Sequence, residues 1–159
     1  MTTETSEDCG VVVTSKTNLL RLSGVDIGEY WPQIQTGIER SFPPQACDVE
    51  RTLSNIQQAL LENRMQCWVG IVDDRVVGSV VTAIATDNCI GAKNLLIYSL
   101  YWPRTDSGET WEDGLQTLRE FARGTGCQKI IGYTQSGAVR KRVIELGGEA
   151  KTVMIELEV

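Results

Sequence analysis

Side chains able to carry acid–base or nucleophilic chemistry are few in this 159-residue chain. The sequence contains no histidine, which excludes Ser-His-Asp and Cys-His catalysis and removes the commonest general base. Its five cysteines are odd in number, far apart and without a C-x-x-C spacing: Cys9, Cys47, Cys67, Cys89 and Cys127. This pattern predicts neither a disulfide framework nor a metal site, so we expect five reduced thiols.

The phenols of apolar segments are the remaining candidates for proton donation. Tyr98, Tyr101 and Tyr133 each fall in such a segment, and a positioned phenol can protonate a leaving group. A tyrosine in a strand is more often a core residue with a satisfied hydroxyl. No glutamate falls inside residues 94–102 or 128–134 to act as a general base.

The charge of the chain limits its partners. A net charge of −6 argues against nucleic acid and against an anionic membrane surface. The exception is the run Arg140–Arg142, where a solvated helix face is favoured over an anion site. Apolar runs such as Val76–Ala85 are too short for the ~20 residues of a membrane span. Residues 1–10 predict a polar, acidic tail without a signal or transit peptide, and hence a cytoplasmic protein.

The first half of the chain predicts strands and two helices. Val11–Val13 and Asn18–Leu22 are short strand candidates. Asp26 predicts the cap of a helix over Glu29–Ser41, and Asp48 that of a second helix.

A hairpin and a buried strand follow. Gln66–Val72 and Arg75–Ala85 are β-prone segments on either side of the turn signal Asp73-Asp74. Asn94–Trp102 is the most continuous apolar stretch, which is typical of a strand buried on both faces.

Helices and strands then alternate. We expect a helix over Thr110–Arg123, a strand over Gln128–Thr134, a helix over Ser136–Leu146 and a last strand over Ala150–Val159. Strands joined through helices imply right-handed crossovers and parallel pairing. The fold class is therefore α/β: residues 11–159 form one domain with a mixed sheet of six to seven strands and about four helices on both faces.

This order resembles the GNAT acetyltransferase fold over residues 17–159. The best local matches are Asn94–Trp102 as the central strand, Thr110–Gly126 as the next helix and Val143–Gly147 as the end of the last helix. Residues 66–77 and 93–101 also resemble small GNAT-like proteins encoded by tailed bacteriophages.

The resemblance implies an acetyl-CoA site whose loop after the central strand wraps the pyrophosphate. The family pattern there is Gln or Arg, two residues, Gly, one residue, then Gly or Ala. Counting back from Phe121-Ala122 and Gly126 places Asp106, Glu109 and Trp111 on these three positions. A frame that begins at Arg104 instead places Ser107 and Glu109 on the two small-residue positions. The pattern thus fails where glycine would let the backbone approach a phosphate.

Carboxylates at the start of the following helix also disfavour a pyrophosphate at this position. Each of Glu109, Glu112 and Asp113 would repel a diphosphate about 7 Å away by roughly 0.5–2.5 kcal/mol. Thr110 and Asp113 also form a variant of the capping box, which predicts a helix that satisfies its own N–H donors.

Two hypotheses remain. The favoured one is a degenerate GNAT-like protein without a cofactor that acts as a structural or protein-binding module, as in a bacteriophage virion. Its partner would be another protein chain or a second copy, in the host cytoplasm or the virion, with contacts from Tyr101, Trp102 and Arg104. In support of this hypothesis, Val143 stands where the family has the tyrosine that acts as general acid on the last helix. An asparagine that the family has earlier in that helix is matched only by Ser136.

The alternative is an acetyl-CoA-dependent N-acetyltransferase with an atypical loop. Tyr98 and Tyr133 would then be the catalytic phenols. The cofactor would be bound by Ser107, Gly108, Glu109, Thr110 and Trp111.

Overall fold

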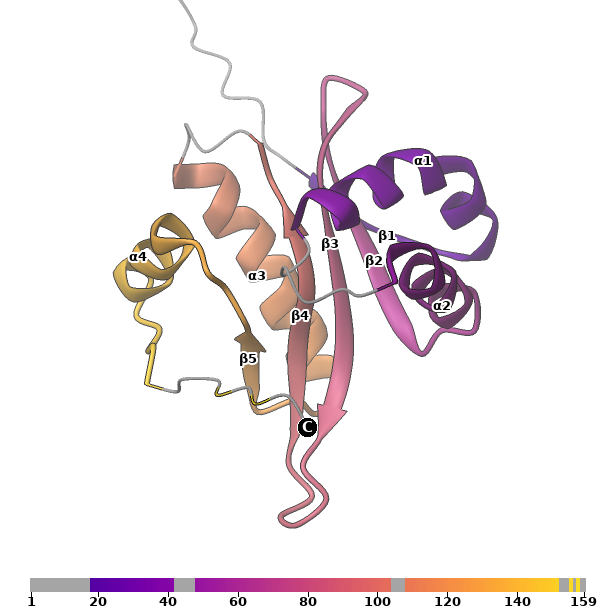
Figure 1. Ribbon diagram of the computed structural model, residues 1–159. Coiled ribbons are helices and arrows are strands. Elements are labelled where there is room, and N and C mark those ends of the chain that lie inside the picture. The colour runs from indigo at the N-terminus through magenta and orange to yellow at the C-terminus, as the bar shows by residue number, and fades with distance from the viewer. Residues whose placement is uncertain (1–17, 42–47, 104–107, 152–154, 156, 158–159) are drawn as a thin grey trace, which may run out of the picture.

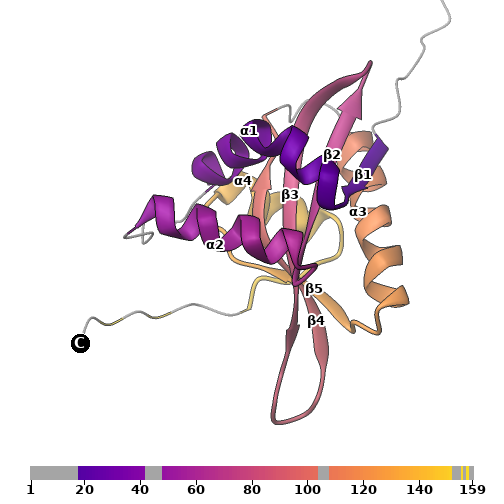
Figure 2. The same ribbon diagram turned by 90° about the vertical axis from the view of Figure 1, so that its right-hand side faces the viewer.

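The computed structural model describes residues 18–41, 48–103, 108–151, 155 and 157. Its five strands form one sheet in chain order: β1 (Asn18–Leu22), β2 (Met65–Val72), β3 (Arg75–Thr86), β4 (Lys93–Tyr101) and β5 (Lys129–Gly132). The helices are α1 (Gly24–Ser41), α2 (Val49–Leu61), α3 (Gly108–Gly124) and α4 (Gly137–Glu145). Figures 1 and 2 show α1 and α2 on one face of the sheet and α3 on the other. The predicted α/β class with helices on both faces is confirmed.

The sheet is mixed as predicted. β1 to β4 pair antiparallel with their neighbours, and β5 pairs parallel with β4. Among the described residues it has five strands rather than six or seven. Of the expected last strand, only residues 150, 151, 155 and 157 are described, and none of them is in a strand. Val11–Val13 lies outside the described residues.

The first helix begins five residues before the predicted start at Glu29. Asp26 lies inside this helix, so the prediction that it is the N-cap was wrong. Ser23 precedes the helix, and its backbone N–H and hydroxyl donate to Asp26 Oδ2 at 3.5 and 3.2 Å. Asp26 therefore accepts, from the third helical position, the hydrogen bond that a capping box directs back to the N-cap N–H.

The second helix and the hairpin follow their sequence signals. Asp48 is the N-cap of α2 and accepts a hydrogen bond from the Arg51 backbone N–H at 3.0 Å. Asp73 and Asp74 join β2 to β3 with φ angles of 48° and 58°. Positive φ at both turn residues is the type I′ geometry that matches the twist of a hairpin, and aspartate tolerates it.

Two apolar clusters fill the space between the sheet and its helices. The cluster beneath α1 and α2 consists of Leu22, Ile27, Ile34, Ile38, Leu53, Ile56, Leu60, Cys67, Val69 and Val81. The cluster beneath α3 consists of Leu19, Trp68, Val80, Leu95, Leu118 and Ala122. Side-chain alternation along β2 explains the division, because Cys67 and Val69 face one side and Trp68 the other.

A row of three buried polar side chains crosses the α3 face of the sheet. The Trp68 indole N–H donates to Thr82 Oγ1 at 3.0 Å, and the Thr82 hydroxyl donates to Gln66 Oε1 at 3.0 Å. All three residues are buried. The threonine hydroxyl thus satisfies a donor and an acceptor that water does not reach.

Trp102 covers two paired glycines on the same face. Gly70 of β2 lies opposite Gly78 of β3. A Cβ atom built on Gly70 would lie 2.1 Å from Trp102 Cη2, and one on Gly78 would lie 2.3 Å from Trp102 Cε3. The indole ring therefore occupies the space that two side chains would otherwise fill.

Candidate functional site

A β-bulge interrupts β4 near its middle. Val81 of β3 pairs with Ser99 and Thr82 pairs with Ile97, so Tyr98 is the extra residue of β4. The Tyr98 side chain is 41% exposed. The predicted burial of this strand on both faces was therefore wrong at the bulge, which turns a side chain out of the regular alternation.

β4 and β5 separate immediately beyond this point. Their pairing runs from Asn94 with Lys129 to Ile97 with Gly132. β4 then continues to Tyr101, whereas β5 ends. Among the described residues, the far half of β4 thus has no strand partner on the β5 side.

The two candidate catalytic tyrosines lie where the pairing of β4 with β5 ends. Tyr98 follows the last paired residue of β4, and Tyr133 follows the last residue of β5. Tyr133 is 70% exposed. Both phenols are therefore accessible to solvent, which the apolar sequence around them did not predict.

The candidate cofactor residues lie at the start of α3. Ser107 lies outside the described residues, and Gly108, Glu109 and Thr110 form the first turn of the helix. Thr110 is the third helical residue, so the prediction that it caps the helix was wrong. Trp111 is half-buried.

The exposed surface of the following turn is acidic. Glu112 and Asp113 are both exposed, and the first cationic residue of α3 is Arg119. Carboxylates near a helix N-terminus are stabilised by the helix dipole. They also oppose the approach of a diphosphate, which that end of a helix would otherwise attract.

Two positions on α4 have structural roles. Ser136 is the N-cap of α4, and its hydroxyl accepts from the Val139 backbone N–H at 3.3 Å. The carbonyl of Val143 accepts from the Gly148 backbone N–H at 2.8 Å after Gly147 turns the chain with φ of 84°. The site positions that the resemblance assigned to Ser136 and Val143 thus begin and end a helix.

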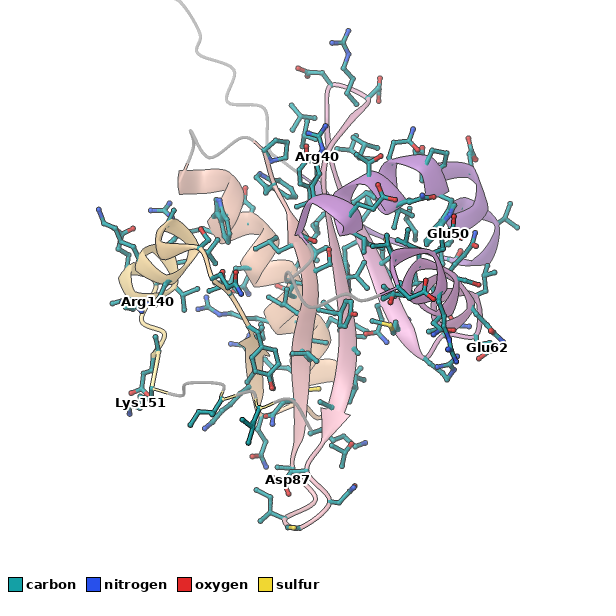
Figure 3. All side chains as sticks on the ribbon, in the orientation of Figure 1. Arg40, Glu50, Glu62, Asp87, Arg140 and Lys151 are labelled. Carbon is teal, nitrogen blue, oxygen red and sulfur yellow. The ribbon has the colours of Figure 1, made fainter. Side chains whose placement is uncertain are left out.

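The three candidate partner-binding residues lie beyond the bulge. The Tyr101 hydroxyl accepts from Arg40 Nη1 at 3.0 Å, and the Arg40 guanidinium lies 5.7 Å from the centroid of the Tyr101 ring. Arg40 belongs to the last turn of α1, and Figure 3 places it near the end of β4. Tyr101 and Trp102 point to opposite faces, as their alternation predicts, and Arg104 lies outside the described residues.

A cavity of about 450 Å³ lies between α1 and the ends of β3 and β4. Its lining residues are Pro32, Gln33, Thr36, Val76, Val77, Gly78, Ser79, Tyr101 and Pro103. The volume is within the range of small-molecule sites. The Thr36 hydroxyl donates a hydrogen bond to the carbonyl of Pro32 at 2.9 Å. The other polar side chains that line the cavity are Gln33, Ser79 and Tyr101.

Within the described ranges, no group of side chains is suited to bind a metal ion. No helix in these ranges is long and apolar enough to cross a membrane.

The three described cysteines, Cys67, Cys89 and Cys127, are free thiols, and Cys9 and Cys47 lie outside the described residues.

We expect Cys89 to be alkylated at least about 100-fold faster than Cys67 in the folded protein at pH 8. Cys89 is exposed, whereas burial raises the pKa of Cys67 to about 12 and keeps it protonated. Timed alkylation read by peptide mass spectrometry measures both rates. Equal rates in the folded state would contradict this prediction, and all five thiols should react after denaturation.

Comparison with family models finds no match to the sequence, and comparison with curated proteins finds none either. Solved structures do match. The aminoglycoside N-acetyltransferase AAC(6')-Iy in complex with CoA is 13% identical with a TM-score of 0.70, over 94% of this chain and 98% of that chain. A predicted acetyltransferase from Clostridium acetobutylicum, with acetyl-CoA, is 17% identical with a TM-score of 0.66, over 89% and 96%.

A ribosomal-protein-alanine N-acetyltransferase from Brucella melitensis biovar Abortus 2308 is 13% identical with a TM-score of 0.63, over 90% of this chain and 98% of that chain. These proteins share the architecture along almost their whole length, at identities that establish the fold and leave the activity open. This chain has the fold of the GNAT superfamily of acetyltransferases.

Proposed function

We propose that this chain is a GNAT-fold protein that has lost acetyl-CoA chemistry and acts as a structural or protein-binding module. The observation that carries the proposal is the acidic start of α3, where Glu112 and Asp113 are exposed. Glu109 and Trp111 stand at the two small-residue positions of the family's loop. A diphosphate would meet repulsion there, and the larger side chains would keep the backbone away from it.

The setting we propose is a bacteriophage virion, in which the chain contacts another protein. Support for this setting comes from the sequence resemblance of residues 66–77 and 93–101 to small phage-encoded proteins. The contact would lie near the end of β4, at Tyr101 and Arg104. The Trp102 ring packs over Gly70 and Gly78. Its contribution to the contact would therefore be to hold the end of β4 in place.

Acetyl-CoA is expected to bind with a dissociation constant above about 1 mM. Isothermal titration calorimetry of the full chain tests this directly. A matched variant with Asp106→Gln, Glu109→Gly and Trp111→Ala rebuilds the loop pattern and should gain affinity. Micromolar binding to the unaltered chain would contradict the proposal.

An acetyltransferase with an atypical loop is the second candidate. The divergence of β4 and β5 beyond Ile97 and Gly132 favours it, because the resemblance implies that acetyl-CoA binds where these strands separate. The backbone of residues 107–111 would hold the phosphates, and Tyr98 or Tyr133 would give a proton to the leaving thiolate. CoA release in the presence of amine acceptors, lost in Tyr98→Phe or Tyr133→Phe, would support this candidate.

A further inference from the structure

Two neighbouring elements depart from regular geometry at the same place in the fold. The pairing of β2 with β3 shifts register between Gly70 and Ile71, which makes Val77 an extra residue of β3. On α1, Pro32 lies inside the helix, where a proline removes one backbone hydrogen bond and bends the helix. Val77 and Pro32 both line the cavity between α1 and the ends of β3 and β4. We call it the α1–β3 cavity.

The bulge at Val77 explains why consecutive residues of one strand line the cavity. Neighbouring side chains of a regular strand point to opposite faces, whereas residues 76–79 all line this cavity. Bulges redirect side chains in this way and are frequent beside active sites. Figure 1 shows α1 lying over the end of the sheet at which the β2–β3 turn is found. Irregular positions on both sides of one cavity are expected at a functional site.

A buried hydroxyl belongs to the lining of this cavity. Ser79 is 3% exposed, and it lies directly beneath α1, because a Cβ atom built on Gly37 would lie 2.3 Å from Ser79 Oγ. The Thr82 hydroxyl, further along β3, donates a hydrogen bond to Gln66 Oε1 at 3.0 Å. The Ser79 hydroxyl donates none within the described part of the chain. A buried donor gains free energy from an acceptor, so a molecule in the cavity would be held by an oxygen placed on Ser79.

The rest of the lining is uncharged. Asp, Glu, Lys and Arg make up 23% of the chain, yet none of them is among the described lining residues. Arg40 lies nearby, but its contacts are with the hydroxyl and ring of Tyr101. The rings of Pro32, Pro103 and Tyr101 and two valines supply apolar surface. An ionised ligand would lose water there without gaining a partner.

We propose that the α1–β3 cavity binds a small neutral molecule with an apolar ring and a carbonyl oxygen that accepts from the Ser79 hydroxyl. A cavity of about 450 Å³ has room for such a molecule. Tyr98, Tyr133 and Trp111 do not line it. The inference therefore goes beyond the proposed function and does not depend on whether acetyl-CoA binds.

Three probes of almost the same shape test the class of ligand. Benzamide is neutral, benzoate is an anion and benzamidine is a cation near neutral pH. Titration of the isotope-labelled full chain, followed by NMR, should show benzamide shifting the backbone amide signals of Thr36, Val77 and Ser79. Its dissociation constant should be at least about 10-fold lower than those of benzoate and benzamidine, because only the charged probes lose hydration without a partner.

Variants at the cavity test the location and the hydrogen bond. Ser79→Ala removes a hydroxyl that has no described acceptor, and it should weaken benzamide binding about 2- to 10-fold. Thr36→Phe places a ring in the cavity from an exposed position on α1 and should abolish binding. Val25→Phe is its matched control, at a position on the same helix that is 87% exposed and outside the lining. It should bind benzamide like the unaltered chain, and circular dichroism checks that each variant is folded.

Four results would overturn the inference. The first is that benzamide leaves the signals of the lining residues unchanged. The second is that benzoate or benzamidine binds as tightly as benzamide, since the site then does not select a neutral ligand. The third is that Ser79→Ala or Thr36→Phe binds benzamide like the unaltered chain. The fourth is that CoA displaces benzamide, because the probe then reports the cofactor site of the second candidate function.

Discussion

Replacing Gly78 with alanine is expected to lower the free energy of unfolding by about 1–3 kcal/mol. The new Cβ would lie 2.3 Å from Trp102 Cε3 and 2.7 Å from the backbone oxygen of Tyr101. A rotamer change could move the Trp102 ring, but the contact with the backbone oxygen of Tyr101 can be relieved only by a shift of the backbone. Urea unfolding of the variant and the unaltered chain measures the difference.

Gly28→Ala is the matched control. Gly28 lies on the exposed side of α1, and a Cβ there meets no atom within 4 Å. Alanine is favoured over glycine inside a helix by about 0.5–1 kcal/mol, so this variant should be slightly more stable. A Gly78→Ala variant as stable as Gly28→Ala would show that the Trp102 ring does not lie across β2 and β3.

Gly70 separates the contribution of the ring from that of the backbone. A Cβ on Gly70 would meet Trp102 atoms as its three nearest contacts. The cost of Gly70→Ala should therefore largely disappear in a Trp102→Ala background. The cost of Gly78→Ala should persist in part, because the Tyr101 backbone oxygen remains. The coupling energy with Trp102→Ala should therefore account for nearly the whole cost of Gly70→Ala and for only part of the cost of Gly78→Ala.

Replacing Thr82 with valine is expected to cost about 2–5 kcal/mol of stability. Valine has nearly the shape of threonine, so the loss comes from the hydroxyl. Without it, the Trp68 indole N–H and Gln66 Oε1 lose the hydrogen bonds of 3.0 Å that they make to Thr82. Each buried group then bears its own desolvation cost of about 1–3 kcal/mol.

Thr82→Ser keeps the hydroxyl and removes one methyl group, so it should cost only about 1 kcal/mol. Chemical denaturation of both variants gives the comparison. If serine and valine cost the same, the methyl group and not the hydroxyl is what matters at this position. The joint variant Gln66→Leu/Trp68→Phe removes both partners, and in that background Thr82→Val should become nearly neutral.

The elements that depend on neighbouring residues were predictable from the sequence. The Asp73-Asp74 turn and the Asp48 cap act within a few residues, and both were confirmed. The start of α1 was missed because Gly24 and Gly28 weaken the helical pattern. The hydrogen bonds from Ser23 to Asp26 at its start are marked in the sequence only by a serine three residues before an acid.

The features that depend on distant pairing were not predictable. The bulge at Tyr98 arises from the register of β3 against β4, and no local sequence signal marks it. The role of Trp102 requires Gly70 and Gly78 to pair with each other first. The apolar run at Asn94–Trp102 predicted an interior strand correctly, but it did not show that β5 would pair with only half of it.

The strand order of the sheet has a consequence for how the chain folds. β2, β3 and β4 follow one another through short connections and lie side by side. Contacts between segments close in sequence form early, because little loop entropy is lost in closing them. We therefore expect β2, β3 and β4 to pair first, and β1 and β5 to join them from either side after the longer segments that carry the helices have closed.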